Sequence, residues 1–138
     1  MQRHVNNNNL NFVKCSQFDI TKNPIEQGIN LNSYDIIIGL DVVHATPDIE
    51  KTLNNLKLLL KNHSLLFLLE TTYAQRWQHL IMGLTRGWWL FNDEWRTLSP
   101  LLPPNCWKKV MEKSRFSQTT VTTLQNKNSD AALIIATL

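Results

Sequence analysis

Two short apolar runs on either side of an amphipathic segment restrict the fold of this chain more than any other feature. The runs are YDIIIGL at 34–40 and SLLFLLE at 64–70. Apolar runs of this length that follow polar loops are typical of strands buried on both faces, as in a parallel sheet. The segment between them, 44–62, repeats apolar residues at helical spacing: Ile49, Leu53, Leu56 and Leu60. The order of strand, helix and strand predicts a right-handed βαβ unit and therefore an α/β protein.

The start of the predicted helix carries residues that favour a helix N-terminus. Thr46 is expected to be the N-cap, and Pro47 fits the first helical position. Asp48 and Glu50 place negative charge in the first turn, where the helix dipole favours it. The helix is therefore expected to begin within a few residues of the first strand.

Weaker patterns predict the other elements of what we expect to be one domain over 1–138. The polar residues 1–10, which include an asparagine run, are expected to form a disordered leader. The remaining expected elements are a strand at 12–20, a loop with one helical turn at 21–33, helices at 74–86 and 105–114, and an antiparallel strand pair at 117–124 and 131–138.

Charge and cysteine content argue against several classes of protein. The 14 basic and 11 acidic residues are scattered, whereas a nucleic-acid-binding protein clusters its basic residues on one face. Cys15 and Cys106 lie far apart without metal-ligand spacing, so we expect reduced thiols. The longest apolar runs are too short to span a bilayer, and the first residues lack the apolar core of a signal peptide. We therefore expect a cytoplasmic protein with no nucleic acid and no membrane among its partners.

Two polar residues follow the ends of the two predicted parallel strands. In open α/β sheets, ligands bind at the carboxyl ends of the strands, and neighbouring strands lie about 4.8 Å apart. His44 and Glu70 should therefore emerge close together, where the carboxylate can fix the imidazole tautomer and leave the other nitrogen free to accept a proton. The alternative is structural: His44 would cap the following helix and Glu70 would be solvated. Asp41 in the same loop is a further candidate, and it fits a loop acid that bonds nearby backbone amides equally well.

The segment 73–95 is rich in aromatic residues. Trp88 and Trp89 follow a break at Gly87 and are candidates for a lid over an apolar pocket. Core packing is the alternative role, and we expect it for most of the aromatic side chains in this segment.

Longer strings of the sequence resemble the C-methyltransferase domains of polyketide synthases. YDIIIGLDVVHATPDIEKTLNNLKLLL is similar to the fourth strand and following helix of these domains. SLLFLLETTYAQRWQHLIMGLTRGWWLFND resembles the region in which a strand ends in Glu and is followed by Arg-Trp and by Gly-Leu-x-x-Gly-Trp-Trp. SPLLPPNCWKKVMEKSRF continues it with Ser-Pro-Leu-Leu, a Trp and a final Phe. The resemblance covers residues 12–138.

This resemblance implies a class I, Rossmann-like fold and S-adenosylmethionine-dependent methylation of the α-carbon of a β-ketoacyl chain on an acyl carrier protein. The catalytic histidine and glutamate of the family fall on His44 and Glu70. His44 would remove the α-proton, and Glu70 would orient the imidazole. No metal is implied, because the sulfonium of the cofactor is already a good leaving group. By the same resemblance, the candidate cofactor-binding residues are Asp19, Ile20, Gly39 and Asp41.

The chain departs from the family pattern in ways that affect the cofactor site. The glycine-rich cofactor loop is absent, and so is the strand whose acid binds the ribose. The chain therefore resembles the C-terminal half of the domain, a partial Rossmann-like sheet that lacks its first strands and ends in an antiparallel strand pair. Its S-adenosylmethionine site is expected to be incomplete. The string KNHS at 61–64 replaces a Pro-Gly-Gly turn, which should cost turn stability.

The missing strands should leave the strand at 34–40 with an exposed edge. Exposed apolar edges tend to pair with another chain. We expect this edge to be covered by the missing N-terminal half, by a second copy in a homo-oligomer, or by the N-terminal segment itself.

Three functions remain open at this level. The first is a methyltransferase fragment that is active only with its missing half. The second is a non-catalytic remnant or structural module that cannot bind S-adenosylmethionine alone. The third is an interaction domain for a carrier protein or another synthase segment, for which a small positive charge would suit an acidic carrier protein.

Overall fold

The structure of the chain is a computed structural model that describes residues 11–123 and 130–138. The leader expected at 1–10 and the last residue of the strand expected at 117–124 lie outside the described residues. Within the described part of the chain, no helix has the length and apolar character needed to cross a membrane. Both cysteines are free.

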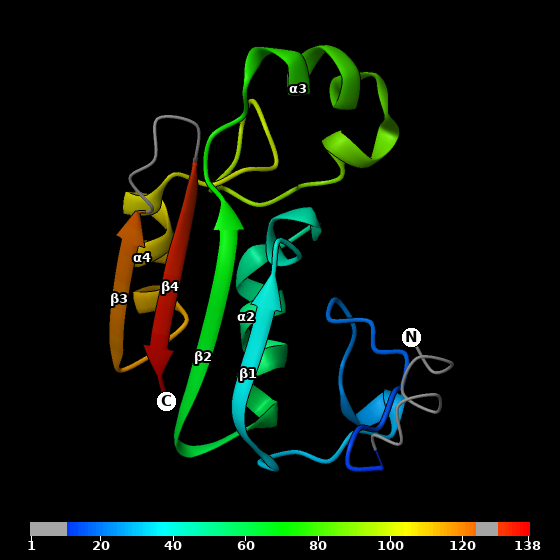
Figure 1. Ribbon diagram of the computed structural model, residues 1–138, viewed down its shortest axis with the longest axis vertical. Coiled ribbons are helices and arrows are strands. Elements are labelled where there is room, and N and C mark those ends of the chain that lie inside the picture. The colour runs from blue at the N-terminus through cyan, green and yellow to red at the C-terminus, as the bar shows by residue number, and fades with distance from the viewer. Residues whose placement is uncertain (1–10, 124–129) are drawn as a thin grey trace.

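A mixed four-stranded sheet organises the fold. β1 (Tyr34–Leu40) and β2 (Leu60–Thr71) are parallel neighbours, as the two apolar runs predicted. β4 (Ala131–Thr137) pairs antiparallel with β2 and with β3 (Gln118–Thr123), which confirms the antiparallel strand pair. The sheet order is β1-β2-β4-β3, and Figure 1 shows β1 and β3 at its two edges.

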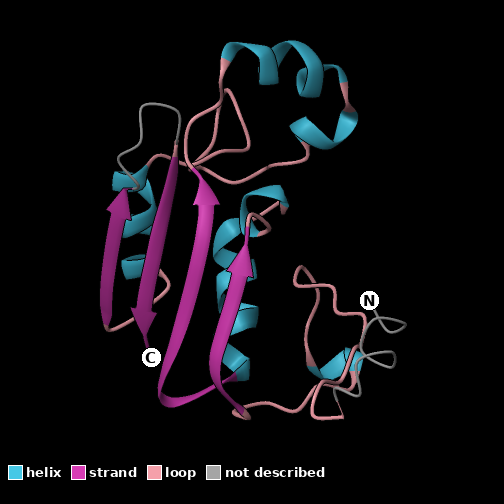
Figure 2. Cartoon of the chain, viewed as in Figure 1, coloured by secondary structure: helices cyan, strands magenta, loops and turns pink. Residues whose placement is uncertain are grey.

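Two helices cover one face of this sheet. α2 (Ile49–Leu59) connects β1 to β2, and α4 (Pro104–Lys113) contacts α2, β3 and β4. Figure 2 shows both helices on the far side of the strands. Because side chains alternate along a strand, every second residue of β2 and β4 faces these helices and is buried. These strand residues are Leu66, Leu68, Glu70, Ala132, Ile134 and Ala136.

The opposite face of the sheet is left open by the described residues. In β1, Ile36, Ile38 and Leu40 expose 53, 78 and 68% of their surface. Their register neighbours on β2 are half-buried: Leu65, Phe67 and Leu69. The apolar run of β1 predicts burial on both faces, and the described chain provides it on one. We call Ile36, Ile38 and Leu40 the open face of β1.

The strand predicted at 12–20 is wrong. Residues 13–19 have no regular secondary structure, and Figure 1 shows this blue segment apart from the sheet. Phe18 and Ile20 nevertheless pack against the hydrophobic core. A strand needs a neighbour that pairs with its backbone, and this segment does not pair with the outer edge of β1. The segment is therefore held by its apolar side chains and not by sheet hydrogen bonds.

Helix α2 begins later than predicted. Asp48, not Thr46, is the N-cap, and its side chain accepts a hydrogen bond from the Lys51 amide at 3.0 Å. The Thr46 hydroxyl instead donates to the Val43 carbonyl at 2.7 Å and closes the 3₁₀ turn η2 (Val43–Ala45). Thr46 and Asp48 are both good capping residues, so the sequence alone did not decide between them.

The helix predicted at 74–86 is broken into short pieces. They are α3 (Arg76–Ile81) and the 3₁₀ turns η3 (Met82–Leu84) and η4 (Arg86–Trp89). Figure 1 shows them beyond the carboxyl ends of β1 and β2, and we call residues 75–91 the arm. The other predicted helical segments are confirmed, by η1 (Ile25–Gln27) and by α4 within one residue of its expected ends.

The turn expected at 61–64 is instead the irregular start of β2, and it contains a residue in a left-handed conformation. His63 has φ = 61°, a region that favours glycine because it crowds the Cβ atom of other residues. Substitution His63→Gly should therefore raise the free energy of unfolding by about 0.5 to 1 kcal/mol in urea denaturation. Asn62→Gly is the matched control, since Asn62 is exposed and has no positive φ, and it should destabilise slightly. Equal effects at both positions would contradict the strain assigned to His63.

Candidate active site

A buried carboxylate lies at the carboxyl end of β2. Glu70 has no exposed surface because it continues the alternation that buries the preceding leucines of β2. Its Oε1 accepts hydrogen bonds from the amides of Val42 at 3.1 Å and Val43 at 2.9 Å. Its Oε2 accepts from the amide of His44 at 3.3 Å. The end of β2 thus holds the loop that follows β1 through three consecutive backbone groups.

His44 makes a fourth contact with the same carboxylate. Its Nδ1 lies 2.7 Å from Glu70 Oε2, and its side chain is 15% exposed. A carboxylate accepts hydrogen bonds, so Nδ1 donates, and Nε2 of the neutral imidazole keeps its lone pair. The strand ends therefore bring His44 and Glu70 together as the sequence predicted, whereas a solvated Glu70 is wrong. The helix-capping alternative for His44 is also wrong, because Asp48 caps α2.

Asp41 lies at the rim of this pair. Its Oδ1 accepts from the Thr71 amide at 3.0 Å and lies 3.4 Å from His44 Nδ1, and its side chain is 51% exposed. The interpretation of Asp41 as a loop acid that bonds a backbone amide is therefore confirmed. Asp41, His44 and Glu70 offer ligand atoms within 4.8 Å of one another. Because the amides and the imidazole already engage both Glu70 oxygens, the arrangement favours a fixed imidazole over a metal centre.

A cavity of about 410 Å³ lies between His44 and the arm. Asp41, His44 and Thr71 line its sheet end. Its apolar wall is formed by Met82, Trp88, Leu90 and Leu101. Trp88 is buried, and its ring meets that of His79 edge-on. It lines the cavity, and its role as a lid stays a prediction.

The neighbouring tryptophan differs from Trp88. Trp89 is 52% exposed, and its indole donates to the Gly83 carbonyl at 2.8 Å inside the arm. It does not line the cavity, whereas Trp107 is fully buried in the core. The core packing expected for most aromatic side chains at 73–95 is wrong: Tyr73, Trp77 and Trp89 are 52, 54 and 52% exposed, and Trp95 packs against the core.

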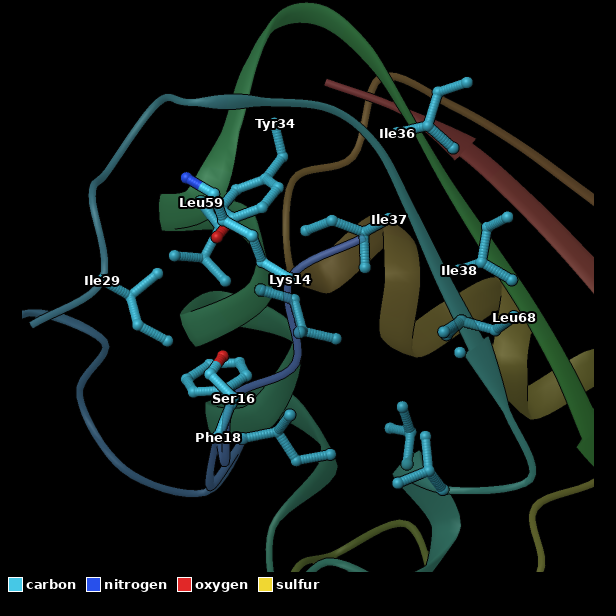
Figure 3. A pocket seen from close by; sticks show the side chains of 15 residues that line it. Lys14, Ser16, Phe18, Ile29, Tyr34, Ile36, Ile37, Ile38, Leu59 and Leu68 are labelled. Carbon is cyan, nitrogen blue, oxygen red and sulfur yellow. The ribbon is translucent and has the colours of Figure 1, made fainter. Parts of the chain in front are cut away.

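The residues expected to bind the cofactor do not form one cluster. Ile20 and Gly39 line a second cavity, of about 380 Å³, which Figure 3 shows between the N-terminal segment, α2 and β1. Asp41 lines the cavity beside His44 instead. A Cβ atom at Gly39 would lie 2.8 Å from Leu68 Cδ2, so a larger residue there would require the Leu68 side chain to shift.

The Asp19 carboxylate is turned toward its own loop. It accepts from the hydroxyl of Thr21 at 2.6 Å and from its amide at 3.0 Å, and it pairs with Lys22 at 3.1 Å. The Thr21 hydroxyl and amide, together with Lys22, hold the pKa of Asp19 below its usual value. Asp19 lines neither the second cavity nor the cavity beside His44.

The second cavity fits only part of S-adenosylmethionine. Its lining is mostly apolar, including Phe18, Ile20 and Ile37, which suits a flat aromatic base (Figure 3). No carboxylate lines it to bind ribose hydroxyls, and its polar side chains are Lys14, Ser16 and Tyr34. The described residues therefore do not make a complete cofactor site.

Sequence reasoning missed two charged residues beside the loop that carries His44. Asp93 and Arg96 form an ion pair at 2.6 Å, with side chains 5% and 0% exposed. Arg96 donates to the backbone carbonyl of His44 at 2.6 Å. The available signal was a pair of opposite charges three residues apart in a stretch without helical or strand periodicity.

Comparison with known proteins gives a consistent result. The highly reducing polyketide synthase FUM1 of Gibberella moniliformis is 44% identical over 99 residues, which are 72% of this chain and 4% of that protein. The methyltransferase calH of Penicillium decumbens is 38% identical over 104 residues, which are 75% of this chain and 28% of that protein. The chain therefore spans a small part of the curated relatives that it matches. No family model matches the chain.

Solved carbon methyltransferases share the fold. The structure of the DszA carbon methyltransferase matches with a TM-score of 0.87 and 31% identity over 99% of this chain and 36% of that chain. The CurJ carbon methyltransferase matches with a TM-score of 0.78 and 37% identity over 87% of this chain and 33% of that chain. Identity, coverage and fold agree, and the chain belongs to the polyketide synthase C-methyltransferase family, matching a portion of its methyltransferase domain.

Proposed function

We propose that this chain supplies the proton-abstracting part of an S-adenosylmethionine-dependent C-methyltransferase. The substrate class is a β-ketoacyl chain on an acyl carrier protein, methylated at its α-carbon. The observation that carries the proposal is the contact between His44 Nδ1 and Glu70 Oε2 at 2.7 Å, beside a largely apolar cavity. It is supported by the similarity to carbon methyltransferases of polyketide synthases.

The chemistry assigned to this chain is removal of a proton. The α-carbon of a β-ketoacyl group lies between two carbonyl groups and is therefore acidic. His44 Nε2 accepts the α-proton, and the electron pair of the C–H bond moves into the enolate. Glu70 keeps the imidazole in the tautomer that leaves Nε2 free, and it stabilises the positive charge that the imidazole gains. The cofactor, when the complete domain binds it, supplies the methyl group.

The cofactor is expected to need residues outside this chain. In isothermal titration calorimetry, the chain alone should show no measurable binding of S-adenosylmethionine. A chimera in which this chain replaces the matching region of calH should bind it. Micromolar binding by the isolated chain would overturn the expectation of an incomplete site. A folded chimera that binds the cofactor but transfers no methyl group would favour the alternative, a non-catalytic structural module.

The remaining part of the domain is also proposed to cover β1. The open face and the unpaired edge of β1 belong to a strand that is apolar on both faces, and such strands are stable when both faces are covered. A second copy of this chain is the alternative cover. Strong exchange protection of the 34–40 amides is expected in the chimera. If the isolated chain is a stable monomer and its 34–40 amides are equally protected, β1 needs neither the rest of the domain nor a second copy to cover it.

A substitution on the open face tests this cover. Ile38→Asp should lower the free energy of unfolding of the chimera by about 2 to 4 kcal/mol, because it buries an unpaired carboxylate in place of an apolar side chain. The effect on the isolated chain should be small, since Ile38 is 78% exposed there. Leu98→Asp is the matched control, with the same 78% exposure but a position outside the sheet. Equal effects of Ile38→Asp in chimera and isolated chain would contradict the proposal.

A further inference from the structure

A buried guanidinium holds the far side of the loop that carries His44. Arg96 has a side chain with no exposed surface. Its Nη1 donates to the carbonyl of His44 at 2.6 Å, and its Nη2 donates to those of Thr46 at 2.8 Å and Pro47 at 3.0 Å. Nη1 also lies 3.4 Å from the carbonyl of Pro100. One planar group thus binds three carbonyls of the loop between β1 and α2.

Asp93 completes this arrangement. It accepts from Arg96 Nη2 at 2.6 Å and from Nε at 3.1 Å, so it neutralises a charge that would be costly to bury alone. Its Oδ2 also accepts from the amide of Ile49, the first residue of α2, at 3.0 Å. The pair therefore connects the His44 loop to the start of the following helix.

The backbone of His44 is consequently held from both sides. Its amide donates to Glu70, and its carbonyl accepts from Arg96. The loop cannot shift away from Arg96 without breaking hydrogen bonds to it, nor away from β2 without breaking those to Glu70. Both restraints act on the residue whose imidazole contacts Glu70 at 2.7 Å.

We propose that Arg96 is a positioning residue that fixes the His44 backbone and thereby keeps the imidazole on Glu70. The inference rests on the proposed function only in calling His44 the base. A lysine cannot replace Arg96, because one ammonium group cannot reach Asp93 and several carbonyls in the directions that the guanidinium serves. The same geometry makes the conservative substitution Arg96→Lys a specific probe.

The experiment measures solvent exchange of the His44 Nδ1 proton by NMR in the full 138-residue chain with ¹⁵N-labelled histidine. The wild-type chain should show a slowly exchanging Nδ1 proton. In Arg96→Lys, exchange should be about tenfold faster, the factor expected from losing one to two buried hydrogen bonds. Lys57→Met is the matched control: Lys57 donates to two backbone carbonyls, of Ser114 and Arg115, at the other end of α2. It should leave the His44 signal unchanged.

Each outcome decides for or against the proposal. Unchanged exchange in a folded Arg96→Lys variant overturns it, as does an equal acceleration in Lys57→Met. If Arg96→Lys does not fold, Asp93→Asn provides the second test and should accelerate exchange by a smaller factor. Failure of both variants to fold, or absence of a protected Nδ1 proton in the wild-type chain, also overturns it. None of these readouts requires methyl transfer. An inactive enzyme would therefore count against the proposed function, whereas the positioning role of Arg96 is tested by proton exchange alone.

Discussion

Substitution Glu70→Ala should lower the free energy of unfolding by about 3 to 5 kcal/mol, the range found when one partner of a buried charged pair is removed. The carboxylate accepts three backbone amides and the His44 imidazole, and it has no exposed surface. Alanine would leave these donors buried without an acceptor, and each unsatisfied group costs about 1 to 3 kcal/mol. The loss is large against the total stability of a small domain, which is about 5 to 15 kcal/mol.

Urea denaturation followed by circular dichroism measures this effect in the isolated chain. Glu26→Ala is the control, since Glu26 is exposed in η1, and it should change stability by less than about 0.5 kcal/mol. Glu70→Gln should fall between the two, because an amide keeps one acceptor oxygen but turns an NH₂ group toward buried donors. A Glu70→Ala variant as stable as the Glu26 control would show that the four donors find other partners.

The parts of the site that sequence predicts are those fixed by strand direction. His44 and Glu70 meet because parallel neighbours end at the same edge, and that requires only the two apolar runs and their order. The burial of Glu70 follows from the same period of two that buries Leu66 and Leu68. The local sequence pattern was enough to predict this contact, because the regular pairing of parallel strands fixes where the two strand ends lie.

The parts that sequence does not predict depend on partners far away in the chain. Arg96 binds carbonyls about fifty positions earlier, and backbone carbonyls have no sequence signature. The strand expected at 12–20 failed for a related reason: its apolar pattern could not reveal that the segment packs on the core through its side chains without pairing with the outer edge of β1. The helix expected at 74–86 is divided into α3 and two 3₁₀ turns, and its periodicity did not show where these breaks fall.

At the open face of β1, the sequence predicts burial that the described structure does not provide. The run Ile36–Ile38 predicts burial on both sides, and Ile37 packs on the core while Ile36 and Ile38 are exposed. Isolated domains rarely leave such a strand half-covered, because contiguous exposed apolar surface promotes association. The match also covers 33% of the chain of the CurJ carbon methyltransferase and 36% of that of the DszA carbon methyltransferase. The half-covered β1 is therefore the observation on which the proposed cover of its open face rests.

Substitution His44→Ala should lower methyl transfer by the chimera with calH by about 100- to 10,000-fold, the contribution of a positioned general base. The imidazole is 15% exposed at the cavity, and its loss leaves Glu70 with three backbone donors. Binding of S-adenosylmethionine should stay nearly intact, because His44 does not line the cavity that contains Ile20 and Gly39. We therefore expect the rate of methyl transfer to an acyl carrier protein-bound β-ketoacyl substrate to fall, while the calorimetric affinity for S-adenosylmethionine stays nearly unchanged.

His63→Ala is the matched control, since His63 lies at the opposite end of β2 and should leave the transfer rate unchanged. Glu70→Gln should slow transfer less than His44→Ala if Glu70 acts through the imidazole, because a less well oriented His44 can still accept the α-proton. Retained transfer in His44→Ala would remove His44 from the role of base. Loss of cofactor affinity together with transfer would assign the histidine to binding, and the contact of 2.7 Å with Glu70 would then be structural.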